Sequence, residues 1–263
     1  MVDTFKNSGY WAIILGGSSG LGLATAKELA QQGMHLCIVH RDRRTEMQRL
    51  TQEFDQLKAN GSQVLHFNLD AMLAQNQEAI ITELKQAMGP DDSVRTIIHS
   101  IAKGHVKPLT GEGGLTLEDY QITINAMALS LVSWVTQVFN ADLFSQDARI
   151  LSFTSEGNSK AWKHYAAVSA AKVSLEAITR SIALEYAPYG IRANCIQAGV
   201  TNTPSLRMIP NVDSLLELAR KRNPHNRTTT PQDVAQVVLL LCTDQAAWIN
   251  GTIIPVDGGE HLL

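Results

Sequence analysis

The chain has 263 residues, of which 44% are apolar and 18% are charged, with 18 glycines and 8 prolines. This composition is typical of an ordinary folded protein and excludes a disordered or collagen-like chain. Lys and Arg number 22 against 25 Asp and Glu, which gives a formal net charge of −3. We therefore expect neither a nucleic-acid partner nor binding to an anionic membrane surface.

The three cysteines, Cys37, Cys195 and Cys242, are far apart in the sequence and form no CxxC pair. This spacing argues against a disulfide framework or a zinc site and predicts three small buried side chains. No histidine lies in a metal-ligand spacing, so no metal is expected. The N-terminus has no basic flank before its first apolar run, and no apolar stretch reaches the length of a spanning helix. We expect a cytoplasmic protein.

Short apolar runs rich in branched residues alternate with segments in which apolar residues recur every three or four positions. The former pattern predicts strands and the latter predicts amphipathic helices. Strands that alternate with helices in this way run parallel, with helices on both faces of the sheet. We therefore predict one doubly wound α/β domain over residues 1–263. The predicted strands are Ala12–Leu15, Leu36–His40, Val64–Phe67, Thr96–His99, Arg149–Phe153, Arg192–Gln197 and Thr252–Val256. The predicted helices lie around 22–32, 44–59, 74–88, 117–140, 164–186 and 231–242.

Two long irregular segments interrupt this alternation. The longer one, at about 201–230, contains a helical pattern over 212–222, and the shorter one covers residues 103–114. Long connections inside compact domains are commonly lids or binding loops. We predict that the 201–230 segment is a substrate loop.

A glycine-rich turn joins the first predicted strand to the first predicted helix. Glycines there permit a tight turn, and the free N–H groups at the start of the helix favour a pyrophosphate. We predict a dinucleotide site, with a plain strand-to-helix turn as the alternative. The predicted contacts in the turn are Gly16, Ser18, Ser19, Gly20, Leu21 and Gly22.

The end of the second predicted strand should lie beside the adenosine ribose. Here it carries Arg41, and a guanidinium suits a 2′-phosphate better than a 2′-hydroxyl. This favours NADPH over NADH, with a solvated charge run as the alternative. Asp70, or with less support Asn68, follows the third strand, where a side chain can meet the adenine amino group. A helix N-cap explains Asp70 equally well.

Several spaced motifs together resemble the short-chain dehydrogenase/reductase family over nearly the whole chain. This resemblance implies a Rossmann-like, mostly parallel seven-stranded sheet, a nicotinamide cofactor and a homotetramer. The motifs are Gly16-x-x-x-Gly20-x-Gly22, Asn125 in the middle helix, Ser155, Tyr165, Lys172, Ala198-Gly199-Val200 and Val256-Asp257-Gly258-Gly259.

The departures from the common family pattern are informative. The position four residues before Lys172 is Val168, and the nearest upstream tyrosine is Tyr165, which gives Tyr-x6-Lys. The fourth strand ends in His99-Ser100-Ile101-Ala102, and Ala198 replaces the usual proline. These features resemble the enoyl-acyl-carrier-protein reductase branch, which reduces a carbon–carbon double bond in fatty-acid synthesis. The resemblance implies an acyl thioester substrate on acyl carrier protein or coenzyme A.

The spacing has a physical rationale. In ketone reduction, hydride reaches the carbon whose oxygen is protonated, whereas in an enoyl thioester it reaches the β-carbon and charge develops on a more distant oxygen. Moving the tyrosine from position 168 to position 165 shifts it by one helical turn, about 4.5 Å, on nearly the same face. The pair can therefore serve the longer substrate.

These considerations assign roles to the site residues. Tyr165 donates a hydrogen bond to the developing enolate oxygen; a structural aromatic residue is the alternative. Lys172 binds the nicotinamide ribose. Ser155 stands where many enoyl reductases have a second tyrosine and where ketoreductases have their catalytic serine, so carbonyl reduction of a 3-oxoacyl thioester stays open. A non-catalytic dinucleotide-binding protein is a third reading. Further predicted cofactor contacts are Ser100, Ile101, Ala102, Lys172, Gly199, Thr201 and Thr203.

Four basic residues near the predicted substrate loop allow two interpretations. They either contact an acidic carrier protein or a coenzyme A phosphate, or they form an ordinary solvated helix end, which the pattern favours. These residues are Arg220, Lys221, Arg222 and Arg227.

Overall fold

The computed structural model describes residues 4–58, 61–209 and 211–263. Seven strands form one sheet in the order β3-β2-β1-β4-β5-β6-β7, and every pair of neighbours is parallel. This confirms the predicted doubly wound sheet. The strands are β1 (Tyr10–Leu15), β2 (His35–His40), β3 (Val64–Asn68), β4 (Ser93–His99), β5 (Phe144–Ser155), β6 (Ile191–Ala198) and β7 (Ile253–Val256).

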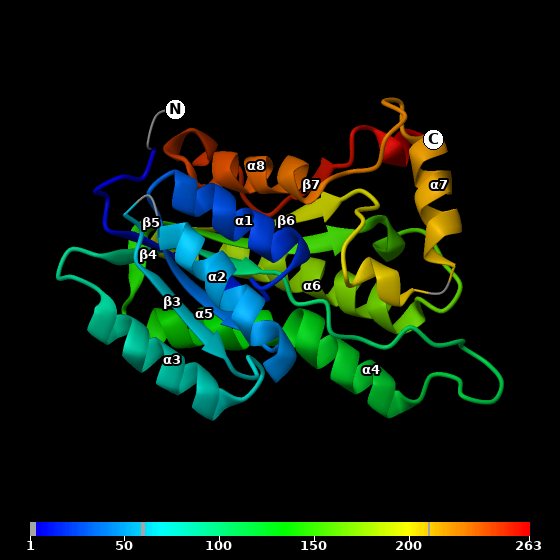
Figure 1. Ribbon diagram of the computed structural model, residues 1–263, viewed down its shortest axis with the longest axis horizontal. Coiled ribbons are helices and arrows are strands. Elements are labelled where there is room, and N and C mark those ends of the chain that lie inside the picture. The colour runs from blue at the N-terminus through cyan, green and yellow to red at the C-terminus, as the bar shows by residue number, and fades with distance from the viewer. Residues whose placement is uncertain (1–3, 59–60, 210) are drawn as a thin grey trace.

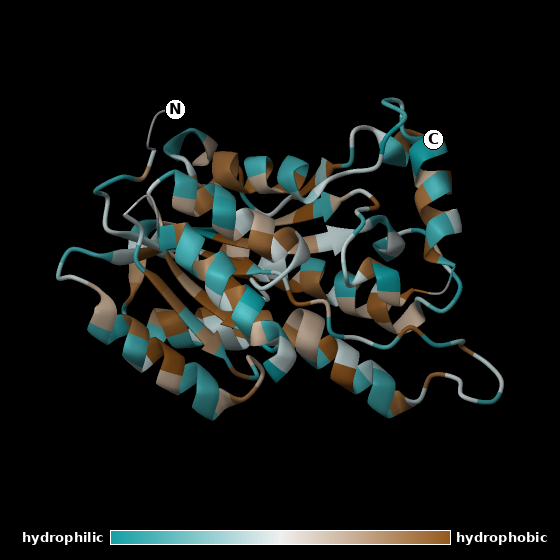
Figure 2. Cartoon of the chain, in the orientation of Figure 1, coloured by the Kyte–Doolittle hydropathy of each residue, from teal (hydrophilic) through white to brown (hydrophobic). Residues whose placement is uncertain are grey.

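Helices cover both faces of the sheet, as Figure 1 shows. Alternate residues of β1 enter two different cores: Trp11 and Ile13 belong to one, and Ala12 and Ile14 belong to the other. Both faces of this central strand are buried, which explains its continuous apolar sequence. Brown predominates on several strands of the sheet in Figure 2. The first core is covered by α3 (Ala74–Ala87), α5 (Ser130–Asn140) and α6 (Ala166–Glu185), and the second by α1 (Gly20–Gln31), α2 (Met47–Leu57) and α8 (Pro231–Cys242).

The segment predicted as one helix over 117–140 has a change of helix type inside it. It comprises α4 (Leu117–Ile124), a π-helical turn over Asn125–Leu129, and α5. By length and composition Leu117–Asn140 is apolar enough to cross a membrane, but half of its apolar window is buried, as in the core helix of a folded domain. Single π-turns inside helices are frequent at functional sites. α7 (Val212–Arg222) lies within the predicted substrate loop.

The three cysteines are free and buried, as predicted. The sheet places its functional edge at the carboxyl ends of β1 and β4. These strands are neighbours, although the chain leaves them in opposite directions toward β2 and β5. In open α/β sheets a ligand crevice forms where the strand order reverses in this way. The glycine turn after Leu15 and the residues after His99 therefore meet at one point.

Candidate active site

A cavity of about 730 Å³ opens at this edge of the sheet. Its size is that of a pocket for a cofactor or a small ligand. It brings together residues from the ends of β1, β2, β4, β5 and β6, from α6 and from the 201–209 segment. The predicted site residues that line it are Gly16, Ser18, Ser19, Gly20, Leu21, Arg41, Ser100, Ile101, Ala102, Ser155, Tyr165, Lys172, Gly199, Thr201 and Thr203; Gly22 and Asp70 do not.

The glycine turn has the backbone geometry that a dinucleotide requires. Gly16 has a φ of +86°, and a Cβ added to it would overlap the carbonyl oxygen of Ser100. A Cβ at Gly22 would overlap the carbonyl of Gly16, so this glycine permits helix packing and does not line the cavity. Ser19 is the N-cap of α1, and its side chain makes no capping hydrogen bond. The first N–H groups of α1 and two seryl hydroxyls thus suit a pyrophosphate.

Tyr165 and Ser155 form a pair of hydroxyl groups inside the cavity. Ser155 ends β5, Tyr165 immediately precedes α6, and their side-chain oxygens lie 3.3 Å apart. Gly157 leaves room for the phenol ring, because a Cβ there would overlap Tyr165 Cε1. The ring of Trp162, which also lines the cavity, lies 5.3 Å from that of Tyr165. Sequence patterns gave no signal for Gly157 or Trp162.

The surroundings of Tyr165 keep its hydroxyl protonated. Burial raises the pKa of Tyr165, and the hydrogen bond with Ser155 only partly opposes this rise. Val168, at the position where common family members have tyrosine, is 5% exposed and packs with Met127 in a small apolar cluster beside Tyr165. The site therefore presents a hydrogen-bond donor one turn before the usual position, and an apolar wall at that position.

Lys172 is buried at the bottom of the cavity. Its Nζ donates to the carbonyl oxygen of Phe153 at 2.8 Å. Burial lowers the pKa of Lys172 from 10.5 to about 8, although the charge of nearby Glu176 acts to raise it. An ammonium has three N–H donors. Two of them are left for other acceptors at the cavity wall.

His99 fixes the π-helical turn rather than facing the cavity. Ser130 Oγ donates to the carbonyl of Ala126 at 2.7 Å, so it accepts from His99 Nε2 at 2.8 Å. Burial, assisted by the charge of Lys172, lowers the pKa of His99 to about 3. His99 is therefore neutral at physiological pH. Asn125, in the same turn, is exposed and does not line the cavity.

Asp70 binds a neighbouring cation and a backbone N–H group in the structure. Its carboxylate binds Arg41 Nη1 at 2.8 Å and accepts from the backbone N–H of Met72 at 3.0 Å. The N-cap of α3 is Leu73, so the alternative N-cap interpretation of Asp70 is wrong. Asn68 instead bonds the backbone of Asp42 through both atoms of its amide. Neither Asp70 nor Asn68 lines the cavity.

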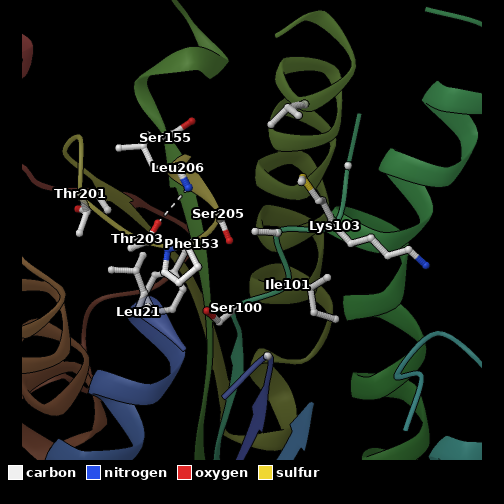
Figure 3. A pocket seen from close by; sticks show the side chains of 18 of the residues that line it. Leu21, Ser100, Ile101, Lys103, Phe153, Ser155, Thr201, Thr203, Ser205 and Leu206 are labelled. Carbon is white, nitrogen blue, oxygen red and sulfur yellow. Dashed lines mark hydrogen bonds between the residues drawn. The ribbon is translucent and has the colours of Figure 1, made fainter. Parts of the chain in front are cut away.

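The 201–209 segment closes one side of the cavity. Thr203 lies against the glycine turn, and its Oγ1 accepts from the N–H of Leu206 at 3.2 Å, as the dashed line in Figure 3 shows. Thr201 Oγ1 donates to the carbonyl of Gly199 at 2.8 Å. Leu206 and the neighbouring Met208 line the cavity and give this side an apolar surface.

A partly buried ion-pair network connects the substrate loop to the cavity wall. Arg222, at the end of α7, binds Glu156 at 2.6 Å and Glu260 at 3.5 Å, and both carboxylates line the cavity. Arg220 and Lys221 bind Glu217 of their own helix, as expected of a solvated helix end. Only the three-dimensional fold brings these distant partners of Arg222 together.

Comparisons with known proteins agree with this geometry. The family model described as enoyl-(acyl carrier protein) reductase matches residues 16–261. An NADH-dependent enoyl-[acyl-carrier-protein] reductase from Bacillus cereus is 29% identical, with 90% of each chain covered. A (2S)-[(R)-hydroxy(phenyl)methyl]succinyl-CoA dehydrogenase subunit from Thauera aromatica is 27% identical, with 95% of this chain and 96% of that one covered.

A solved structure resembles the chain along its entire length. It is the Bacillus cereus enoyl-acyl carrier protein reductase with NADP+ and an indole naphthyridinone, with a TM-score of 0.87 and 26% identity, covering 100% of this chain and 99% of that one. Relatives of similar identity thus include reductases and dehydrogenases, and their names include both NADH and NADP+. Nothing in the described ranges groups three His, Cys, Asp or Glu side chains for a metal.

Proposed function

Because the chain belongs to the short-chain dehydrogenase/reductase family, we propose that it reduces the carbon–carbon double bond of an enoyl thioester. The family model that it matches is of the enoyl-(acyl carrier protein) reductase type, and the chain is an NAD(P)H-dependent oxidoreductase. The observation that carries the proposal is the placement of Tyr165. Its hydroxyl lies in the cavity 3.3 Å from Ser155 Oγ, while Val168 makes the usual tyrosine position apolar. This placement suits a hydrogen bond from the Tyr165 hydroxyl to the thioester oxygen, which is distant from the carbon that accepts hydride.

The residues of the chain supply orientation and charge stabilisation. The cofactor supplies hydride when it is bound. Tyr165, protonated because burial raises its pKa, donates a hydrogen bond to the thioester oxygen as negative charge develops there. Lys172 keeps its ammonium close to this anion and holds the ribose hydroxyls with its remaining N–H groups. The apolar wall around Val168 and Met127 excludes water from the reacting double bond.

A carbonyl reductase acting on a 3-oxoacyl thioester is the second candidate, and Ser155 favours it. A serine hydroxyl 3.3 Å from the tyrosine oxygen is an arrangement that also suits a ketone oxygen. Enoyl reduction has more support, because a ketone whose carbon accepts hydride needs its donor beside the nicotinamide, and the residue at the usual tyrosine position is the apolar Val168.

We assign NADPH as the preferred cofactor on the basis of Arg41, which lines the cavity at the end of β2. The side chain of Arg41 is 64% exposed on the rim, so its guanidinium can reach a phosphate without unfolding any element. The carboxylate of Asp70 binds this guanidinium at 2.8 Å and lies outside the cavity lining, so it is not placed to bind a 2′-hydroxyl. NADH is the disfavoured alternative.

We further assign the 201–230 segment as the substrate loop of a single domain over residues 1–263. The apolar side chains of Leu206, Met208 and Ile209 support this role, since they offer an acyl chain a surface inside the cavity. The acyl group is carried by acyl carrier protein or coenzyme A, and the protein acts in the cytoplasm as a homotetramer. Ser155 has a supporting role next to Tyr165.

The test is a direct substrate comparison. Purified protein is mixed with NADPH and either crotonyl or acetoacetyl thioester, and the loss of nicotinamide absorbance is followed. The proposal predicts rapid oxidation of NADPH with the crotonyl substrate and slow oxidation with the acetoacetyl one. Turnover of the ketone alone would establish the carbonyl reductase instead, and tight NADPH binding without turnover of either would indicate a non-catalytic binding protein.

A further inference from the structure

Two cations from distant parts of the sequence approach one carboxylate oxygen at the rim of the cavity. Arg41 Nη1 lies 2.8 Å from Asp70 Oδ2, and Lys103 Nζ lies 3.9 Å from the same oxygen. Arg41 follows β2, and Lys103 belongs to the segment that leaves β4. Because both nitrogens contact one atom, they are no farther apart than the sum of these two distances. A single group with several anionic oxygens can therefore bind both.

The pairing of these groups is open to exchange. The side chain of Arg41 is 64% exposed, that of Lys103 is 49% exposed and that of Asp70 is 20% exposed. Ion pairs with this much solvent access contribute little to stability, so an anion of higher charge can displace the carboxylate. Two cations share the one carboxylate of Asp70, while the carboxylate of Asp42, which also lines the cavity, is bonded to His40 Nδ1 at 2.9 Å.

The position of the cluster points to the ribose end of a dinucleotide. Both cations line the same cavity as the glycine turn, and Asp70 does not line it. Figure 3 shows Lys103 extending away from Ser155 and Thr201, toward the other side of the cavity. Ser18 and Ser19, whose hydroxyls suit a phosphate, line the cavity as well.

We propose that Arg41 and Lys103 together form a clamp for the 2′-phosphate of the cofactor, and that Asp70 is its competing anion. In the free protein Asp70 holds the two cations near each other. When a phosphate binds, its oxygens replace the carboxylate on both cations, so Asp70 limits the affinity. This inference rests on the proposed use of NADPH and makes Lys103 a specificity-determining residue.

The first experiment measures binding without turnover. Adenosine 2′,5′-bisphosphate and 5′-AMP are titrated calorimetrically into wild-type protein and the Lys103→Met variant. We expect the variant to bind the bisphosphate about tenfold more weakly, because one charge-assisted contact is lost, and to bind 5′-AMP within about twofold of wild type. The matched control is Lys107→Met, which removes a charge from the same segment. Its ammonium binds Asp119 at 2.9 Å, so both affinities should stay unchanged.

The second variant tests the competing anion. Asp70→Asn keeps the shape of the side chain and removes its charge, so the bisphosphate should bind about threefold more tightly. Weaker binding would overturn the role given to Asp70.

The outcomes separate the clamp from the cofactor assignment. If wild-type protein prefers the bisphosphate and Lys103→Met keeps that preference, or weakens both ligands equally, the clamp is wrong while NADPH use stands. If wild-type protein has no preference for the bisphosphate, the NADPH assignment fails and the clamp fails with it.

Discussion

The two ends of the sheet bury cations in opposite ways. At the amino ends of β4 and β5, Arg95 and Arg149 are each 1% exposed. Every nitrogen of both guanidinium groups donates to an acceptor. The acceptors are the carboxylates of Asp147 and Asp244, the backbone carbonyls of Asp147 and Ala148, and carbonyls at the end of α8 and in the adjoining chain. These charges join two strands to a helix, and each of their nitrogens already has an acceptor.

At the carboxyl ends of the same strands, Lys172 is 8% exposed but donates to a single acceptor that the structure describes, the carbonyl of Phe153. Burial lowers its pKa to about 8. Asp147 at the opposite end responds differently: burial alone would raise its pKa, but the hydrogen bond and charge of Arg149 and the neighbouring guanidinium groups lower it. A saturated buried charge stabilises the fold, whereas an unsaturated one beside a cavity is available for chemistry.

Among the variants considered, Lys172→Met should have the largest effect on activity, because it removes the buried charge at the cavity. We expect kcat/KM to fall about 10³-fold, because an ammonium next to the developing anion is lost. Stability should be unchanged or higher, because the variant no longer buries a charge. Enzyme assays and urea unfolding measure the two effects, with the exposed Lys58→Met as the control. A large loss of stability in Lys172→Met would mean that this lysine is structural.

Asp147→Asn should have the opposite effect, with a loss of stability and no loss of activity. Removing the carboxylate leaves buried guanidinium groups without their anion, which costs about 3 kcal/mol of unfolding free energy. The folded fraction should keep the kcat/KM of wild type, since Asp147 is at the far edge of the sheet. The control is Glu217→Gln in an exposed ion pair on α7, where urea unfolding should show little change. Equal destabilisation by both variants would contradict the difference between the saturated cluster and a surface pair.

Gly157→Ala tests whether the position of the Tyr165 hydroxyl at the carboxyl ends of the strands matters for activity. The added methyl group overlaps the ring of Tyr165, so the hydroxyl must move away from its position beside Ser155. A displacement of about 1 Å in a donor of this kind lowers kcat by about 10²-fold. KM for NADPH should not change, because Gly157 does not line the cavity. Steady-state kinetics separate these parameters, and a change confined to KM would refute the positioning role.

The smallest expected effect concerns pH. Lys172 has a pKa of about 8 in the folded chain, against 10.5 without burial. As pH rises through 8 the folded enzyme loses the ammonium, so kcat/KM should be about half of its maximum near that pH and fall further above it. Between 8 and 10.5 the unfolded chain binds more protons at this position, so its contribution to stability rises with pH. Activity that stays constant to pH 9.5 would contradict this assignment.

Sequence periodicity predicted the centres of the strands well and their ends less well. The strand predicted over Arg149–Phe153 extends back to Phe144, which pairs with Val94, and the register shifts between this pair and the pair of Thr96 with Arg149. The intervening polar residues carry no apolar period, and they include Asp147 of the buried arginine cluster. The π-turn also has no distinct pattern, since it depends on packing and on the hydrogen bond from His99 to Ser130.

The site was predictable where a local motif specifies it and not where distant segments meet. The glycine turn, Tyr165 and Lys172 have fixed spacings, and the structure places all of them at one cavity. Lys103 has no motif, because only the fold brings it near Asp70. For the same reason, the ion pairs of Arg222 with Glu156 and Glu260 could not be anticipated, since each partner comes from a different part of the chain.

The central claim is that the Tyr165 hydroxyl stabilises the anion formed during reduction of an enoyl thioester. The most direct measurement is the single-turnover rate of crotonyl thioester reduction by Tyr165→Phe, together with its Kd for NADPH. We predict a rate about 10²-fold below that of wild type, the effect of losing one donor to a developing oxyanion, with cofactor affinity unchanged. A variant that reduces the crotonyl thioester at the wild-type rate would contradict the account.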